Sequence, residues 1–121
     1  FKVDLIDDIL ASKEMYIGRY YKEKQKWIAA INRFRTVVDN YETTVYTEEA
    51  LHRLVEIHYR IGLENEAKKF AKLLGYNYQS SKWYAQSYMI FDKKYEKNRI
   101  SLIKKNNKTK EIIKKFKSLI N

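Results

Sequence analysis

Three side chains that can bind a metal ion or exchange a proton follow one another at intervals of four residues: Glu48, His52 and Glu56. In a helix this spacing places them on one face, where they could bind a divalent metal or simply form solvated, helix-stabilising pairs. We favour the solvated face, because His58 lies six residues from His52 and points elsewhere. The sequence contains no cysteine, HExxH motif, phosphate-binding glycine loop or recognisable Ser-His-Asp arrangement. It therefore predicts no metal, no cofactor and no enzymatic activity.

The composition favours an all-helical protein. The 121 residues include three glycines and no proline, and 45% of them are hydrophobic. Such a chain can form a core and needs only short connections between its helices. No apolar run approaches the roughly 20 residues of a membrane-spanning helix.

The positive charge is concentrated at the C-terminal end. Residues 92–121 contain eleven Lys or Arg and three Asp or Glu, whereas residues 1–91 contain fourteen and twelve. The basic tail could be a polar capping helix, or it could bind an acidic partner or an anionic membrane surface. We favour capping. The tyrosines could stack on nucleic acid bases, but core packing explains Tyr21, Tyr59, Tyr84 and Tyr88 better.

Apolar periodicity and turn signals divide the chain into helices. A tight turn is expected at residues 22–26, and Gly62, Gly75 and the KNNK stretch at 105–108 are expected to end helices. Thr47 and Ser81 are expected to cap the helices that follow them. The predicted helices cover residues 3–23, 27–40, 47–61, 64–74, 81–104 and 109–120.

The order of a long helix, a short turn and another helix matches the 34-residue tetratricopeptide pattern. Gly18 would lie against Ala30 where the first two helices cross. We predict an all-α tetratricopeptide α-solenoid of two to three hairpins with a C-terminal capping helix. It would be one domain over 1–121, with repeats at about 11–44, 48–78 and 80–121. The expected repeat-packing residues are Ile17, Gly18, Tyr21, Trp27, Ala30, Phe34, Leu54, Ala67 and Trp83.

The first helix begins about two turns before its repeat should. Val3, Ile6 and Ile9 therefore have no predicted partner within the chain. Because repeats need neighbours to bury their faces, we expect upstream repeats to cover these side chains. The chain would then be the C-terminal end of a longer solenoid.

Two phrases within residues 13–84 resemble one known family. They are W-x-A-x-x-N-R, from Trp27 to Arg33, and N-Y-x-x-S-x-W-Y, from Asn77 to Tyr84. Both are similar to the C-terminal part of the BamD family, tetratricopeptide lipoproteins of the outer-membrane β-barrel assembly machinery of Gram-negative bacteria. The lysine-rich extension beyond about Lys93 is longer than this family leads us to expect.

The resemblance implies a non-catalytic scaffold at the periplasmic face of the outer membrane. Its partners would be a POTRA domain of BamA and a small BamE-like lipoprotein, with no nucleic acid. Membrane contact would occur only through a lipidated N-terminal cysteine that this sequence lacks. The implied partner-binding residue is Arg33, whose guanidinium suits a carboxylate, with Asn32 and Arg35 on exposed flanking positions.

Two other functions fit the same residues. The chain could be a different periplasmic or cytoplasmic tetratricopeptide scaffold, or a helical-repeat protein that binds nucleic acid through its basic tail. Steep salt dependence would distinguish nucleic acid binding.

Overall fold

The computed structural model describes residues 2–79 and 81–120, except the side chains of residues 2, 3, 93–100 and 102. Within these residues the chain is all-α, as predicted, and has no strand. No helix in this part of the chain is long and apolar enough to cross a membrane. The helices are Lys2–Glu23 (α1), Trp27–Asn40 (α2), Thr47–Arg60 (α3), Glu64–Asn77 (α4), Lys82–Phe91 (α5) and Lys93–Ile120 (α6).

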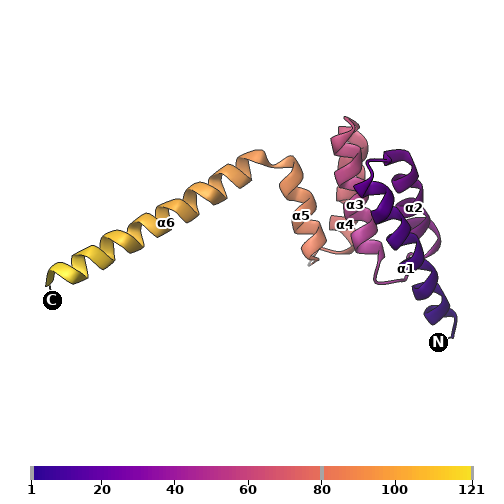
Figure 1. Cartoon of the computed structure of the whole chain (residues 1–121), viewed down its shortest axis with the longest axis horizontal. Helices are drawn as coiled ribbons and strands as arrows, with labels where there is room; N and C mark the ends of the chain where they lie inside the picture. The colour runs from indigo at the N-terminus through magenta and orange to yellow at the C-terminus, as the bar shows by residue number, and fades with distance from the viewer. Residues whose placement is uncertain (1, 80, 121) are drawn as a thin grey trace. The chain divides into compact units, whose positions relative to one another are not determined.

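The chain divides into two compact units, residues 1–90 and residues 91–121. In the first unit α1 pairs with α2 and α3 with α4, and α2 packs against α3 (Figure 1). Two helical hairpins stacked in this way are the arrangement of a tetratricopeptide-like solenoid, which confirms the predicted fold class. The division into repeats and the capping role of the tail stay predictions.

A continuous core fills the space between the two hairpins. Met15 of α1, Phe34 of α2 and Leu54 and Ile57 of α3 are all fully buried. All four lie on the apolar stripes of their helices, so the stripes of α1, α2 and α3 face one another in the core. Of the predicted packing residues, Gly18, Ala30, Phe34, Leu54 and Ala67 are buried, whereas Ile17, Tyr21, Trp27 and Trp83 are half-buried.

Gly18 allows α1 and α2 to approach closely. A Cβ atom at Gly18 would lie 2.7 Å from Cε1 of Phe34. The Phe34 ring therefore packs directly against Gly18, at the place where we predicted Ala30. A larger residue at position 18 would displace this ring from the core.

Two tight turns end α1 and α3 with the same hydrogen bonds. Gln25 has φ 58° and Gly62 has φ 90°, both in the left-handed region. After α1 the amide of Lys26 donates to the carbonyl of Tyr21 over 2.9 Å, and after α3 the amide of Leu63 donates to His58 over 2.8 Å. This Schellman geometry suits glycine, so Gly62 ends its helix as predicted.

Gly75 does not end α4, and this prediction was wrong. The helix continues to Asn77. A Cβ atom at Gly75 would collide with the ring of Tyr84 from α5. The glycine is a site of close approach rather than a stop, which the sequence pattern alone does not distinguish.

Thr47 does not cap its own helix, which corrects a second prediction. Its hydroxyl donates to the carbonyls of Tyr41 and Glu42, at 3.1 and 2.9 Å. It therefore ties the start of α3 to the end of α2. Ser81 does act as a cap, because its Oγ accepts from the amide of Trp83 over 3.1 Å.

The break in the C-terminal region lies at Asp92, not at the KNNK stretch. α5 ends at Phe91, and α6 runs without interruption through residues 105–108. The hydroxyl of Thr109 donates to the carbonyl of Lys105 over 2.9 Å, one helical turn back. Asparagine weakens a helix only modestly without glycine or proline beside it, so two asparagines do not end this one.

Apolar side chains on the first half of α1 are exposed. Ile6 and Ile9 are 55% and 60% exposed, as expected for a face without a partner in the chain, and Val3 lies outside the described side chains. One core prediction fails elsewhere, since Tyr88 is 48% exposed.

Candidate docking surface

A groove between α1 and α2 contains two of the three residues predicted to bind a partner. It has a volume of about 330 Å³. Glu14 and Tyr21 of α1 line one wall, and Ala29, Asn32, Arg33 and Thr36 of α2 line the other. The structure thus brings Asn32 and Arg33 together on an accessible surface.

Arg33 forms an ion pair within this groove. Its Nη1 lies 3.1 Å from Oε2 of Glu14, and the two side chains are 40% and 19% exposed. Glu14 occupies the position where the tetratricopeptide pattern has tryptophan. The departure from the pattern therefore has a structural consequence: a charged pair replaces an apolar contact and holds the guanidinium at the groove.

Arg35 lies apart from this groove. It is exposed on α2 but is not among the lining residues, because two positions along a helix turn a side chain by about 200°. Asn32 is exposed, and its carbonyl accepts a hydrogen bond from the Thr36 hydroxyl over 2.9 Å. Whether any of the three binds a partner stays a prediction.

A seam of ion pairs joins α1 to α3 in the same unit. Nε of Arg19 donates to Oε2 of Glu49 over 2.9 Å. Nζ of Lys22 lies 3.3 Å from Oε2 of Glu56. Arg53 bridges the two carboxylates, at 3.1 Å from Glu49 and 2.8 Å from Glu56. Glu56 therefore does not lie on the predicted solvated face but belongs to a network between helices.

The seam keeps its carboxylates ionised. Burial alone would raise the pKa of Glu56, but hydrogen bonds from His52 and Arg53, with the charges of His52 and Lys22, lower it to about 2. Burial likewise opposes ionisation of Glu49, and the contacts with Arg19 and Arg53 hold the pKa of that carboxyl below its usual value. Both carboxylates therefore stay charged across the physiological range.

His52 is buried, which overturns the solvated face predicted for it. It is 4% exposed, and its Nδ1 lies 2.8 Å from Oγ of the fully buried Ser87 of α5. Its Nε2 lies 3.1 Å from Oε1 of Glu56. The structure thus joins Ser87, His52 and Glu56 through successive side-chain contacts, although Ser87 lies far from the other two in the chain. A nucleophile must be accessible to its substrate, and Ser87 is fully buried. The contacts instead hold α5 against α3.

The sequence carried little signal for this burial. The buried apolar residues of α3 share one stripe of about 160°, and His52 lies outside it. They are Leu51, Leu54, Val55 and Ile57. The burial of His52 depends on α5, whose Ser87 supplies the partner that a buried polar side chain needs. Trp83 of α5 covers the same place, with its ring 5.2 Å from that of His52 and 5.4 Å from the Arg53 guanidinium.

No metal site is formed by the acidic and histidine side chains of the described residues. Among them, no three His, Asp or Glu side chains converge closely enough to hold an ion. Of the set Glu48, His52 and Glu56, only the last two are in contact. His58 is buried separately, with Nδ1 2.7 Å from the carbonyl of Leu54.

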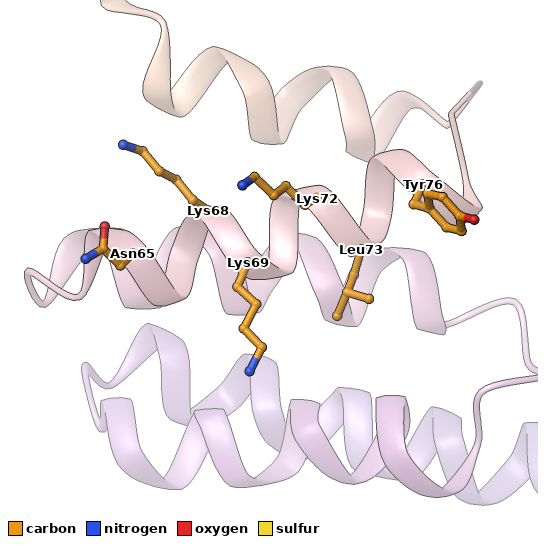
Figure 2. Close-up of a pocket in the computed structure, with 6 residues that line it drawn as sticks. All are labelled: Asn65, Lys68, Lys69, Lys72, Leu73 and Tyr76. Atoms are coloured by element: carbon orange, nitrogen blue, oxygen red, sulfur yellow. The ribbon is translucent and has the colours of Figure 1, made fainter.

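A second surface feature, which the sequence analysis missed, lies on α4. A hollow of about 610 Å³ is lined by Asn65, Lys68, Lys69, Lys72, Leu73 and Tyr76. Figure 2 shows Lys68 and Lys72 extending from one side of the helix and Lys69 from another. The spacing of three or four residues puts this set on one broad face, which we call the α4 lysine face.

The sequence of this unit matches known proteins. Residues 1–73 match the YfiO family, described as outer membrane lipoprotein. The chain belongs to this family. It is 55% identical over 89 residues to the outer membrane protein assembly factor BamD of Rickettsia prowazekii, covering 74% of this chain and 36% of that protein. It is 45% identical over 91 residues to BamD of Caulobacter vibrioides, covering 75% and 30%.

The likeness continues at lower identity and does not cover whole proteins. BamD of Neisseria meningitidis serogroup A is 32% identical over 74 residues, which are 61% of this chain and 28% of that protein. The chain thus spans about a third of the length of the curated relatives it matches. The match to the family ends at residue 73, before α5 and α6 begin.

Proposed function

We propose that this chain is a non-catalytic docking segment of the machinery that assembles β-barrel proteins in the outer membrane. The proposal is supported by its similarity to proteins named outer membrane protein assembly factor BamD. It is also supported by the chemistry of the chain, whose Ser-His-Glu contacts are buried and whose accessible groove offers charge and hydrogen bonds instead of a nucleophile. The segment would act at the periplasmic face of that membrane.

The observation that carries the docking mechanism is the Glu14–Arg33 pair in the groove between α1 and α2. Only Nη1 of Arg33 contacts Glu14, and 40% of the arginine side chain is exposed. The rest of the planar guanidinium can therefore bind a partner carboxylate with two parallel hydrogen bonds. Glu14 keeps the arginine in place before the partner arrives, which lowers the entropy lost on binding.

We infer that the partner is a POTRA domain of a BamA-like protein, the partner that the family resemblance implies. A BamE-like lipoprotein would contact the same segment. Asn32, beside Arg33 in the groove, would contribute a directional hydrogen bond, whereas Arg35 would contribute at the rim.

Calorimetry of this chain with the barrel-proximal POTRA domain of the same organism tests the proposal. Arg33→Glu should weaken binding by about tenfold or more, because a buried charged pair is lost and a repulsion introduced. Since this variant also breaks the pair with Glu14, the exchange Glu14→Arg with Arg33→Glu is the matched control. It restores an ion pair between α1 and α2 but presents the opposite charge to the partner.

The proposal requires that the exchanged pair folds normally and still fails to bind. If the exchanged variant binds the POTRA domain, Arg33 has only a structural role and the partner does not recognise the charge of the groove. If the folded wild-type chain does not bind the POTRA domain, docking through this segment is wrong. Arg35→Glu should have a smaller effect than Arg33→Glu, since Arg35 lies outside the groove.

A further inference from the structure

We propose that α6 binds the surface of an anionic lipid bilayer, lying parallel to the membrane plane. The inference concerns a part of the chain beyond the matched family residues, and it does not depend on docking through Arg33. It adds a membrane contact to the lipid anchor that the family resemblance implies.

The apolar residues of the C-terminal half of α6 form one stripe. Ile112, Ile113, Phe116, Leu119 and Ile120 follow the spacing of one helix face. They are 59%, 49%, 64%, 84% and 69% exposed. Five large apolar side chains in one exposed row are more than scattered surface residues, and they require a cover.

Lysines border this stripe on both sides. Residues 103–120 contain seven lysines and one glutamate, Glu111. By helical geometry, Lys104, Lys108 and Lys115 follow one edge of the stripe, and Lys110, Lys114 and Lys117 lie beyond the other. All six are exposed. An apolar stripe with lysines along its borders is the pattern of a helix that lies in a membrane interface, because lysine stems cover apolar surface while the ammonium groups reach lipid phosphates.

The continuity of α6 makes this surface possible. A break at residues 105–108 would have separated Lys104 from the stripe, but the helix is one ribbon from Lys93 to Ile120 (Figure 1). Lys104 and Lys108 therefore stand on the same edge as Lys115. The whole row can face one flat surface at the same time.

Charge selects a lipid surface over a second copy of the chain. Two α6 helices packed through their stripes would bring two sets of seven lysines together, and like charges oppose such a pairing. An anionic bilayer covers the stripe with acyl chains and neutralises the lysines with phosphates. The family matched by residues 1–73 is described as outer membrane lipoprotein, which is consistent with a bilayer as the cover of this stripe.

Vesicle flotation with the full 121-residue chain tests the proposal. The chain should float with vesicles of phosphatidylethanolamine and phosphatidylglycerol, and much less with vesicles of phosphatidylcholine alone. Phe116→Ser should lower the partition constant by about tenfold. The double change Lys108→Gln with Lys115→Gln should lower it by about tenfold on anionic vesicles, with little effect on neutral ones.

The α4 lysine face supplies matched controls. Tyr76→Ser removes an aromatic side chain that is 90% exposed, and Lys68→Gln with Lys72→Gln removes two exposed lysines. Neither should change flotation. All variants alter exposed residues, so circular dichroism should show wild-type helix content.

Four results would overturn the proposal. They are the absence of binding to anionic vesicles, equal binding to neutral ones, loss of binding in the α4 controls, and no effect of Phe116→Ser. Sedimentation that shows a dimer dependent on Phe116, without flotation, would assign the stripe to a second copy. Binding to polyglutamate without flotation would assign the lysines to an acidic protein.

Discussion

The two units of this protein use the same residue types in opposite ways. In residues 1–90, fourteen basic and twelve acidic residues nearly balance, and several are joined in the seam between α1 and α3. In residues 91–121, eleven basic residues outnumber three acidic ones. Phe34 of the first unit is fully buried, whereas Phe116 of the second is 64% exposed.

The difference shows that amphipathic patterning does not by itself say what covers an apolar stripe. The stripes of α2 and α3 face helices joined to them by short turns, so folding buries them. The stripe of α6 has the same periodicity and remains exposed. Covered stripes stabilise the fold, and exposed stripes with a charged border serve binding.

Equivalent phenylalanine substitutions in the two units should give the largest difference in stability. Phe34→Ala should destabilise the protein by about 3–5 kcal/mol, because it leaves a cavity between α1 and α2. Phe116→Ala should change stability by less than about 0.5 kcal/mol. Urea unfolding followed by circular dichroism measures both. Phe34→Leu, with an expected loss of about 1–2 kcal/mol, provides a measurable variant if the alanine does not fold. Equal losses at positions 34 and 116 would break the comparison.

The next largest difference in stability is expected between a glutamate of the first unit and one of the second. Glu56→Gln should cost about 1–3 kcal/mol at neutral pH, because its cationic partners lose their carboxylate. Glu111→Gln on α6 is the matched control and should be nearly neutral.

Acid should distinguish the same two glutamates. The pKa of Glu56 is lowered from 4.5 to about 2 in the folded protein, so its contribution is fully present above pH 4.5. This stability is lost as the pH falls from 4.5 toward 2. Thermal melts across that range should fall more steeply for the wild type than for Glu56→Gln. Parallel curves would mean that the seam does not stabilise the fold.

Gly18→Ala tests whether a methyl group at position 18 stabilises or destabilises the protein. At an incidental helix glycine, alanine would stabilise by about 1 kcal/mol. Here the new Cβ would lie 2.7 Å from the Phe34 ring, so we expect a loss of about 1–2 kcal/mol. Combining it with Phe34→Leu should recover part of the loss, since the smaller side chain can move away. A stabilised Gly18→Ala protein would contradict the close approach of α1 and α2.

The smallest effects concern glycine at two polar positions. Gln25→Gly should stabilise the first unit by about 0.5–1 kcal/mol, because Gln25 has φ 58°. Asn107→Gly should instead reduce helix content, because position 107 lies inside α6. Circular dichroism and thermal melts measure both changes. Unchanged helix content in Asn107→Gly would favour a break at residues 105–108 after all.

Most of the fold of the first unit could be predicted from local pattern. The start of α2 at Trp27 and of α3 at Thr47 and the stop at Gly62 follow from periodicity and turn chemistry, which act between neighbouring residues. The pattern misjudged Gly75, because its role depends on Tyr84, nine residues further on and on another helix. It misjudged residues 105–108, because a cluster of polar residues resembles a loop although none of these residues is a helix breaker.

The candidate site was predictable in part. Asn32 and Arg33 came from a phrase shared with a family, and the structure places both in one groove. The pair of Arg33 with Glu14 and the contact of His52 with Ser87 join residues 19 and 35 positions apart. Such partners cannot be read from spacing along one helix.

The sequence by itself determined the helical class, the first hairpin and the segregation of charge, because these depend on composition and on interactions within a few residues. Only the tertiary structure decided which polar groups are buried and paired. It did so because α3 packs against α2 and α4 and also meets α1 and α5 through paired side chains, so Glu56 and His52 must find partners from other helices.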